Sequence, residues 1–136
     1  MIVFNWMKYD EQEWHKKLYM SMLAYADIVL SVFSTMAIEA AMLDKPTLTI
    51  GFDGYHTRPP HQSVVRLEEL AHFRHVLDTG TVPLIRSFPD LKEKLAFYLA
   101  HPEADRDKRA ALVKYMCYQM DGNASKRIAD EIFRYV

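Results

Sequence analysis

Two short apolar runs, separated by one short helical segment, place the strongest limit on how this chain folds. Ile28–Leu30 is a continuous apolar run, which is typical of a strand that is buried on both faces of a parallel sheet. A helix rich in Ala, Met and Leu is expected from Ser34-Thr35 through Leu43, and Asp44-Lys45-Pro46 ends it because proline cannot continue a helix. Thr47–Ile50 then predicts a second buried strand. This order predicts a parallel strand–helix–strand unit.

The remaining patterns extend this unit in both directions. The chain is expected to contain further strands and helices at Ile2–Phe4 (strand), Glu11–Ala26 (helix, with Trp14, Leu18, Met22 and Tyr25 on one face), Glu68–Leu77 (short helix), Thr81–Ile85 (strand), Ser87 to His101 (helix), a helix with Val113, Met116, Cys117 and Met120 on one face, and a last helix with Ile128, Ile132 and Phe133. We therefore predict an α/β fold, a partial Rossmann-like parallel sheet flanked by helices with a helical C-terminal tail, in one domain over residues 1–136.

Composition excludes several classes of protein. The 17 basic and 18 acidic side chains give a net charge of −1, which argues against nucleic-acid binding because such binding depends on clustered Lys and Arg. The one cysteine, Cys117, cannot form an internal disulfide, so we expect a reducing, cytoplasmic location. No apolar run reaches the roughly 18 residues that span a bilayer, and membrane contact is expected to be peripheral at most, at the inner face. No GxGxxG or P-loop pattern is present.

The start of the helix after the first run is the main candidate site. Backbone N–H groups at a helix start suit a phosphate, and the hydroxyls of Ser34 and Thr35 would add uncharged donors; the alternative is that both residues only cap the helix. A capping box needs its acid three residues after the capping residue, and Glu39 does not stand at that distance from Ser34 or Thr35. Glu39 lies one turn after Thr35, in a helix that is apolar almost all round. It is a candidate to accept the hydroxyls of a ribose, or else it reaches solvent or pairs with Lys45.

The loop after the second strand supplies weaker candidates. Residues 52–62 hold Asp53, His56, Arg58 and His61, and α/β folds place ligand-binding groups in such loops. Arg58 would meet a phosphate and a histidine would serve as acid or base, although an ordinary polar loop and an Asp53-Gly54 turn explain the same residues. His72 and His75 lie three residues apart, but we expect no metal site because no third ligand stands near them.

The segment from Tyr25 to Gly54, YADIVLSVFSTMAIEAAMLDKPTLTIGFDG, resembles the nucleotide-binding half of GT-B glycosyltransferases. Within that fold it is most similar to the CDP-glycerol glycerophosphotransferase and capsule-polysaccharide transferase group, with UDP-GlcNAc 2-epimerases as relatives. The resemblance continues through His72-Phe73, Thr79-Gly80 and the tail from Cys117-Tyr118 to Ala129.

The resemblance implies that Ser34 and Thr35 contact the donor diphosphate, that Glu39 binds the ribose and that His72 contributes to the sugar or phosphate pocket. The expected function is donor binding in a transferase that moves a sugar or glycerol phosphate to a cell-envelope polymer, with the nucleotide donor as substrate and no cofactor. The N-terminal acceptor domain of such enzymes is expected to be absent, so a separate domain chain or self-association is an expected partner. Two alternatives remain, a UDP-sugar 2-epimerase-like fragment and a non-catalytic interaction module.

Overall fold

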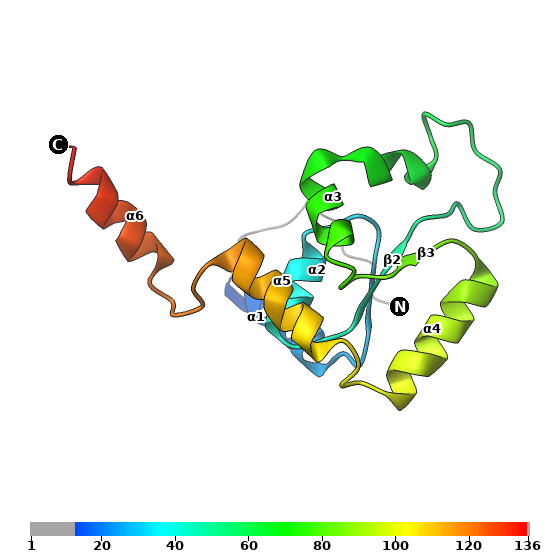
Figure 1. Ribbon diagram of the computed structural model, residues 1–136, viewed down its shortest axis with the longest axis horizontal. Coiled ribbons are helices and arrows are strands. Elements are labelled where there is room, and N and C mark those ends of the chain that lie inside the picture. Colours follow the sequence, from blue (N-terminus) through cyan, green and yellow to red (C-terminus); the bar gives the residue numbers. More distant parts are fainter. Residues whose placement is uncertain (1–12, 136) are drawn as a thin grey trace.

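A three-stranded parallel sheet forms the centre of the structure (Figure 1). The computed structural model describes residues 13–135, so the strand expected at Ile2–Phe4 lies outside the described residues. The strands are β1 (Val29–Ser31), β2 (Thr47–Ile50) and β3 (Leu84–Ile85), in the order β1-β2-β3. With helices on both faces of this sheet, the partial Rossmann-like α/β prediction is confirmed.

β2 is the central strand and matches the predicted range. Its backbone pairs with β1 through Val29–Thr47 and Ser31–Thr49, and with β3 through Ile50–Ile85. Leu48 and Thr49 are fully buried, as a strand covered on both faces requires.

The prediction that the first apolar run is buried on both faces is wrong for β1. Within residues 13–135 this strand lies at the edge of the sheet, and Leu30 on its second face is 47% exposed. Helix α4 (Phe88–Ala100) packs over β2 and β3 through Leu48, Ile85 and Tyr98, and does not cover Leu30.

β3 is shorter than predicted. Thr81 and Val82 are buried, but the strand pairing begins only at Leu84, directly after Pro83, which has no N–H to donate to a ladder. The Thr81 hydroxyl instead donates to the backbone carbonyl of Lys108, at 3.2 Å. Side-chain burial is therefore not accompanied by strand pairing in the first half of the predicted strand.

Two helical layers enclose the sheet. On the face opposite α4, helices α2 (Met36–Met42), α3 (Ala71–Asp78) and α5 (Arg106–Cys117) meet around Phe33, Ala37, Phe73 and Leu112. The 3-10 helix η2 (Val64–Glu69) leads into α3. Helix α4 starts as its sequence predicts, because the Ser87 side chain accepts a hydrogen bond from the Asp90 backbone.

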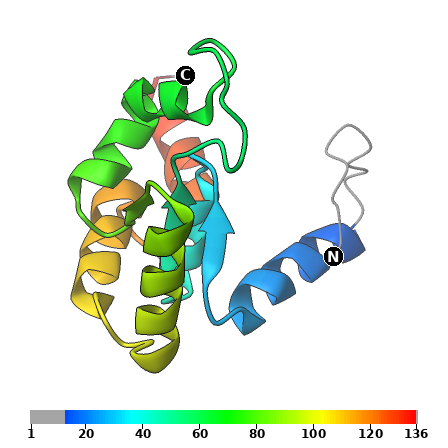
Figure 2. The ribbon, with the colours of Figure 1, turned by 90° about the vertical axis from the view of Figure 1, so that its right-hand side faces the viewer.

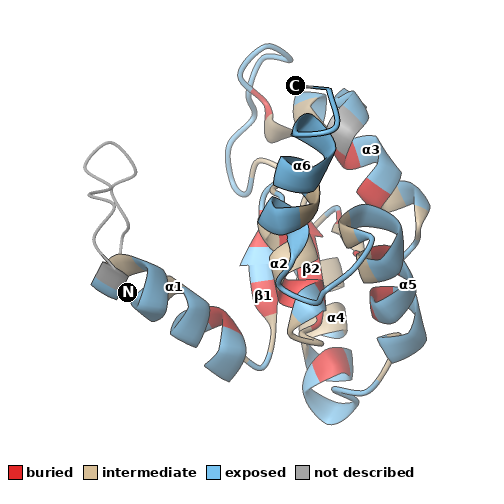
Figure 3. Ribbon diagram, turned by 90° about the vertical axis from the view of Figure 1, so that its left-hand side faces the viewer, coloured by how far each residue is buried: buried red, intermediate tan, exposed pale blue. Residues whose placement is uncertain are grey.

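The two terminal helices depart from the main body. Helix α1 (Glu13–Tyr25) exposes the apolar face expected to pack, including Trp14, Leu18, Met22 and Tyr25, and buries Leu23 against Val29 and Ala40 instead. Helix α6 (Ala124–Ile132) has no buried residue (Figure 3). No helix among residues 13–135 is long and apolar enough to cross a membrane.

Arg109 joins α5 to the turn between α2 and β2. Its guanidinium donates to the Asp44 carboxylate at 2.8 Å and to the backbone carbonyls of Pro102 and Ala104. Arg109 is only 2% exposed, whereas the side chain of the neighbouring Arg106 is 64% exposed. Partial desolvation is the largest single effect on Asp44 and raises its pKa. The hydrogen bonds and charges of Arg109 and Arg106 act in the opposite direction and together outweigh it, so the pKa of Asp44 is lowered.

We expect Arg109→Ala to lower the free energy of unfolding by about 2–4 kcal/mol, because it removes a buried cation, leaves two backbone carbonyls without a donor and leaves the Asp44 carboxylate with Arg106 alone. Arg106→Ala is the matched control, since Arg106 pairs with the same Asp44 but has a side chain that is 64% exposed; it should cost less than about 1 kcal/mol. Urea unfolding followed by circular dichroism measures both. Equal losses would show that burial of Arg109 does not strengthen its contacts.

Candidate functional site

The carboxyl ends of the three parallel strands lie at one edge of the sheet, and the candidate residues follow two of these ends. β1 leads through Phe33 to Ser34, Thr35 and α2, while β2 leads into the loop over residues 52–62. Figure 2 shows this loop at the end of the sheet to which the strand arrows point. Parallel pairing thus brings Ser34, Thr35 and the loop to the edge where open α/β sheets bind ligands.

Ser34 and Thr35 play different local roles. The Ser34 hydroxyl accepts a hydrogen bond from the Met36 backbone at 3.2 Å, so Ser34 does contribute to capping. Thr35 is the capping residue by position, yet its side chain makes no capping hydrogen bond, and the residue is exposed. α2 has only seven residues, which limits the helix dipole at this point. The Thr35 hydroxyl therefore has no capping role in the structure.

Glu39 lies one turn after Thr35, and its backbone N–H donates to the Thr35 carbonyl at 3.4 Å. The residue is half-buried, and the Tyr19 hydroxyl of α1 donates to its carboxylate. No ion pair between Glu39 and Lys45 occurs among the described residues. Helix α1 thus supplies Glu39 with a contact that the sequence alternatives did not include.

Asp53 anchors the loop. Its carboxylate accepts a hydrogen bond from the Val64 backbone at 2.8 Å, and its backbone carbonyl accepts one from the His56 N–H at 3.3 Å. Gly54 follows with φ of +68°, a conformation that favours glycine. The hydrogen bonds from Ser63 and Val64, together with the nearby charge of Arg58, hold the pKa of Asp53 below its usual range. Asp53 thus acts as the turn residue that the sequence allowed.

The other loop candidates are exposed. His56, Arg58 and His61 all lie on the surface of the loop, and the His61 ring nitrogen Nε2 lies 3.2 Å from the side-chain amide nitrogen of Gln62, within hydrogen-bond distance. No hydrogen bond or ion pair joins these three residues to Ser34, Thr35 or Glu39 within the described part of the chain. His72 belongs to α3, and its side chain lies outside what the structure describes. Among the described residues, no group of three His, Cys, Asp or Glu could hold a metal ion.

Three features of this edge of the sheet could not be predicted from the sequence patterns. Tyr55 is 89% exposed and stacks on Phe88, with ring centres 4.4 Å apart. Ser31 and Thr49 are paired residues on neighbouring strands, and both hydroxyls are buried and have no hydrogen-bond partner among the described residues. Tyr19 reaches Glu39 across 20 residues of sequence. Each depends on pairing between distant segments, which hydrophobic periodicity does not encode.

We expect Asp53→Ala to release the loop, with amide exchange at Val64 faster by about tenfold. In the wild type the same anchor should persist at neutral pH and weaken as the pH falls through the lowered pKa of Asp53, because a carboxylate with a depressed pKa stabilises the folded form only while it is ionised. Hydrogen exchange, corrected for the intrinsic pH dependence, measures both effects. Asp78→Ala, an exposed acid on α3, is the control and should leave Val64 unchanged.

A family model described as CDP-Glycerol:Poly(glycerophosphate) glycerophosphotransferase matches residues 12–134 of this chain. The match spans α1 to α6, so it includes Ser34, Thr35, Glu39 and the whole of the loop. Comparison with curated proteins and with solved structures gives no significant match.

Proposed function

The chain belongs to the CDP-glycerol:poly(glycerophosphate) glycerophosphotransferase family, and from this premise we propose that it binds the nucleotide part of CDP-glycerol at the start of α2. The proposal rests on one observation: a hydroxyl that makes no capping hydrogen bond, that of Thr35, is followed one helical turn later by an acid, Glu39. Thr35 makes no capping bond, and the half-buried Glu39 already accepts a hydrogen bond from a hydroxyl group. A carboxylate so placed suits the two hydroxyls of a ribose.

In this proposal the diphosphate contacts the Thr35 hydroxyl and the backbone near Ser34, while the ribose extends along α2 towards Glu39. The reaction of the family joins a glycerol phosphate group to a poly(glycerophosphate) acceptor. A terminal hydroxyl of the acceptor attacks the phosphorus that carries the glycerol, the phosphoanhydride bond breaks, and CMP leaves with the bond electrons. The single proton of the attacking hydroxyl transfers to a base, and donors at Ser34 and Thr35 stabilise the charge on the departing phosphate.

The loop over residues 52–62 lies on the side of the proposed diphosphate position that is away from Glu39. Glu39 contacts α1, which flanks the β1 edge, whereas the loop leaves β2 and reaches Phe88 at the start of α4. With the ribose on the Glu39 side, the loop is positioned to meet the glycerol phosphate or the acceptor. Arg58 and the histidines His56 and His61 provide the cationic and proton-transferring groups that phosphates require.

A second candidate function is an interaction module, favoured by the open edge of the sheet. Within residues 13–135, β1 pairs with β2 alone and exposes Leu30 and Val32. An edge strand of this kind can accept another chain.

We expect Glu39→Ala to weaken CDP binding by about 10- to 100-fold, because it removes a charged acceptor of two hydrogen bonds. Titration calorimetry with CDP and with UDP measures the loss and the preference for the base. Tyr19→Phe removes the hydroxyl that occupies Glu39, and should keep or raise the affinity. Glu69→Ala, an exposed acid on η2, is the matched control. Unchanged affinity in Glu39→Ala, with a thermal unfolding curve like that of the wild type, would remove Glu39 from the site.

A further inference from the structure

Helix α1 is attached to the main body along one narrow side. Leu23 is the one buried residue among residues 14–25, and it belongs to a buried cluster with Val29 and Ala40. Tyr19 lies one turn earlier on the same side of the helix and packs, partly buried, against the same cluster. Figure 3 shows most of the rest of the helix exposed. The docking of α1 therefore depends on a small contact area.

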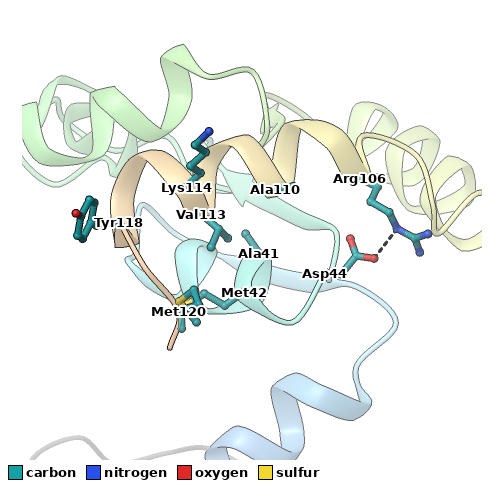
Figure 4. Close-up of a pocket in the computed structure, with 9 residues that line it drawn as sticks. All are labelled: Ala41, Met42, Asp44, Arg106, Ala110, Val113, Lys114, Tyr118 and Met120. Carbon is teal, nitrogen blue, oxygen red and sulfur yellow. Dashed lines mark hydrogen bonds and ion pairs between the residues drawn. The ribbon is translucent and has the colours of Figure 1, made fainter. Parts of the chain in front are cut away.

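The other side of α2 is fixed by α5. Ala41 of α2 lies in the same buried cluster as Leu112 of α5. Directly after α2, the Asp44 carboxylate accepts hydrogen bonds from both Arg106 and Arg109. Figure 4 shows α5 along this side of α2, together with the Arg106–Asp44 ion pair. If α1 and α2 separate, α1 is therefore the helix that moves.

The Tyr19 hydroxyl occupies an oxygen that the proposed ligand needs. It donates a hydrogen bond to Oε2 of Glu39. In the proposed function the Glu39 carboxylate accepts the two neighbouring hydroxyls of a ribose, and two such donors use both carboxylate oxygens. The tyrosine and the ribose therefore compete for Oε2. A protein that binds a ligand only in its open state has an apparent affinity equal to the intrinsic affinity multiplied by the open fraction.

We propose that α1 is an autoinhibitory helix, which closes the nucleotide site at Glu39 while it is docked through Tyr19 and Leu23, and which is released when CDP-glycerol binds. This role of α1 rests on the proposed function, because the ligand that competes with Tyr19 is the ribose assigned to Glu39. The effect is reciprocal: the nucleotide weakens the docking of α1 by the same factor by which α1 weakens the binding of the nucleotide.

Substitutions on α1 that leave Glu39 intact test the proposal. Tyr19→Phe removes the competing hydroxyl, and Leu23→Ala removes the buried anchor of the helix. Each should raise the affinity of the full chain for CDP by about 3- to 10-fold in titration calorimetry, because each raises the open fraction. Leu18→Ala is the matched control, since Leu18 is an exposed residue of the same helix, and it should leave the affinity unchanged. Circular dichroism checks that each variant folds.

Hydrogen exchange of the wild type measures the release of α1 directly. At saturating CDP the amides of residues 16–25 should exchange about tenfold faster, because a helix of this length is marginally stable in water once it is undocked. The amides of α4, which does not contact α1, are the internal reference and should be unchanged. In Glu39→Ala chains, Tyr19→Phe should have no further effect on the remaining affinity, since the shared oxygen is absent.

Two kinds of failure are distinguishable. CDP binding that leaves the exchange of α1 unchanged or slows it, or that neither Tyr19→Phe nor Leu23→Ala tightens, would overturn autoinhibition and leave the proposed site at Glu39 in place. Absence of CDP binding in the wild type and in both variants would overturn the proposed function, and the role of α1 with it.

Discussion

Parallel pairing on both sides of β2 is the constraint on which the rest of the structure depends. Two parallel strands can be joined only by a crossover. The chain must therefore leave one strand at the carboxyl end of the sheet and cross back to the opposite end before the next strand begins. α2 performs this crossover before β2, and the segment from the loop to α3 performs it afterwards. The same geometry sends Ser34, Thr35 and the loop to one edge of the sheet, and the candidate site lies there.

The core follows from this arrangement. α2 covers the β1 side of the sheet and packs on α5, and the buried Arg109 ties the start of α5 to the turn that enters β2. α4 covers only β2 and β3, which leaves Leu30 exposed. Within residues 13–135, large apolar side chains are exposed on β1 and on the two terminal helices, as at Leu30, Met22 and Ile128.

The contact between Tyr19 and Glu39 shows how the periphery affects the site. A half-buried carboxylate is costly without a donor, and α1 supplies one. In the proposed function a ribose hydroxyl would replace the tyrosine hydroxyl, so the position of α1 would matter for binding although α1 makes few buried contacts. The family match includes α2, and the geometry of α2 is the basis of the proposed nucleotide site, so both point to the same part of the chain.

Local sequence signals determined the elements of this protein. The apolar run of β2, the proline that ends α2, the serine that starts α4 and the candidate residues at the start of α2 could all be identified from neighbouring residues, because each depends on backbone preferences or on short-range capping. Only the tertiary structure decided which faces are covered. The burial of Arg109, the exposure of Leu30 and of the α1 face, the shortening of β3, and the Tyr19–Glu39 contact all depend on which distant segment packs against them, and periodicity in one segment carries no information about its partner.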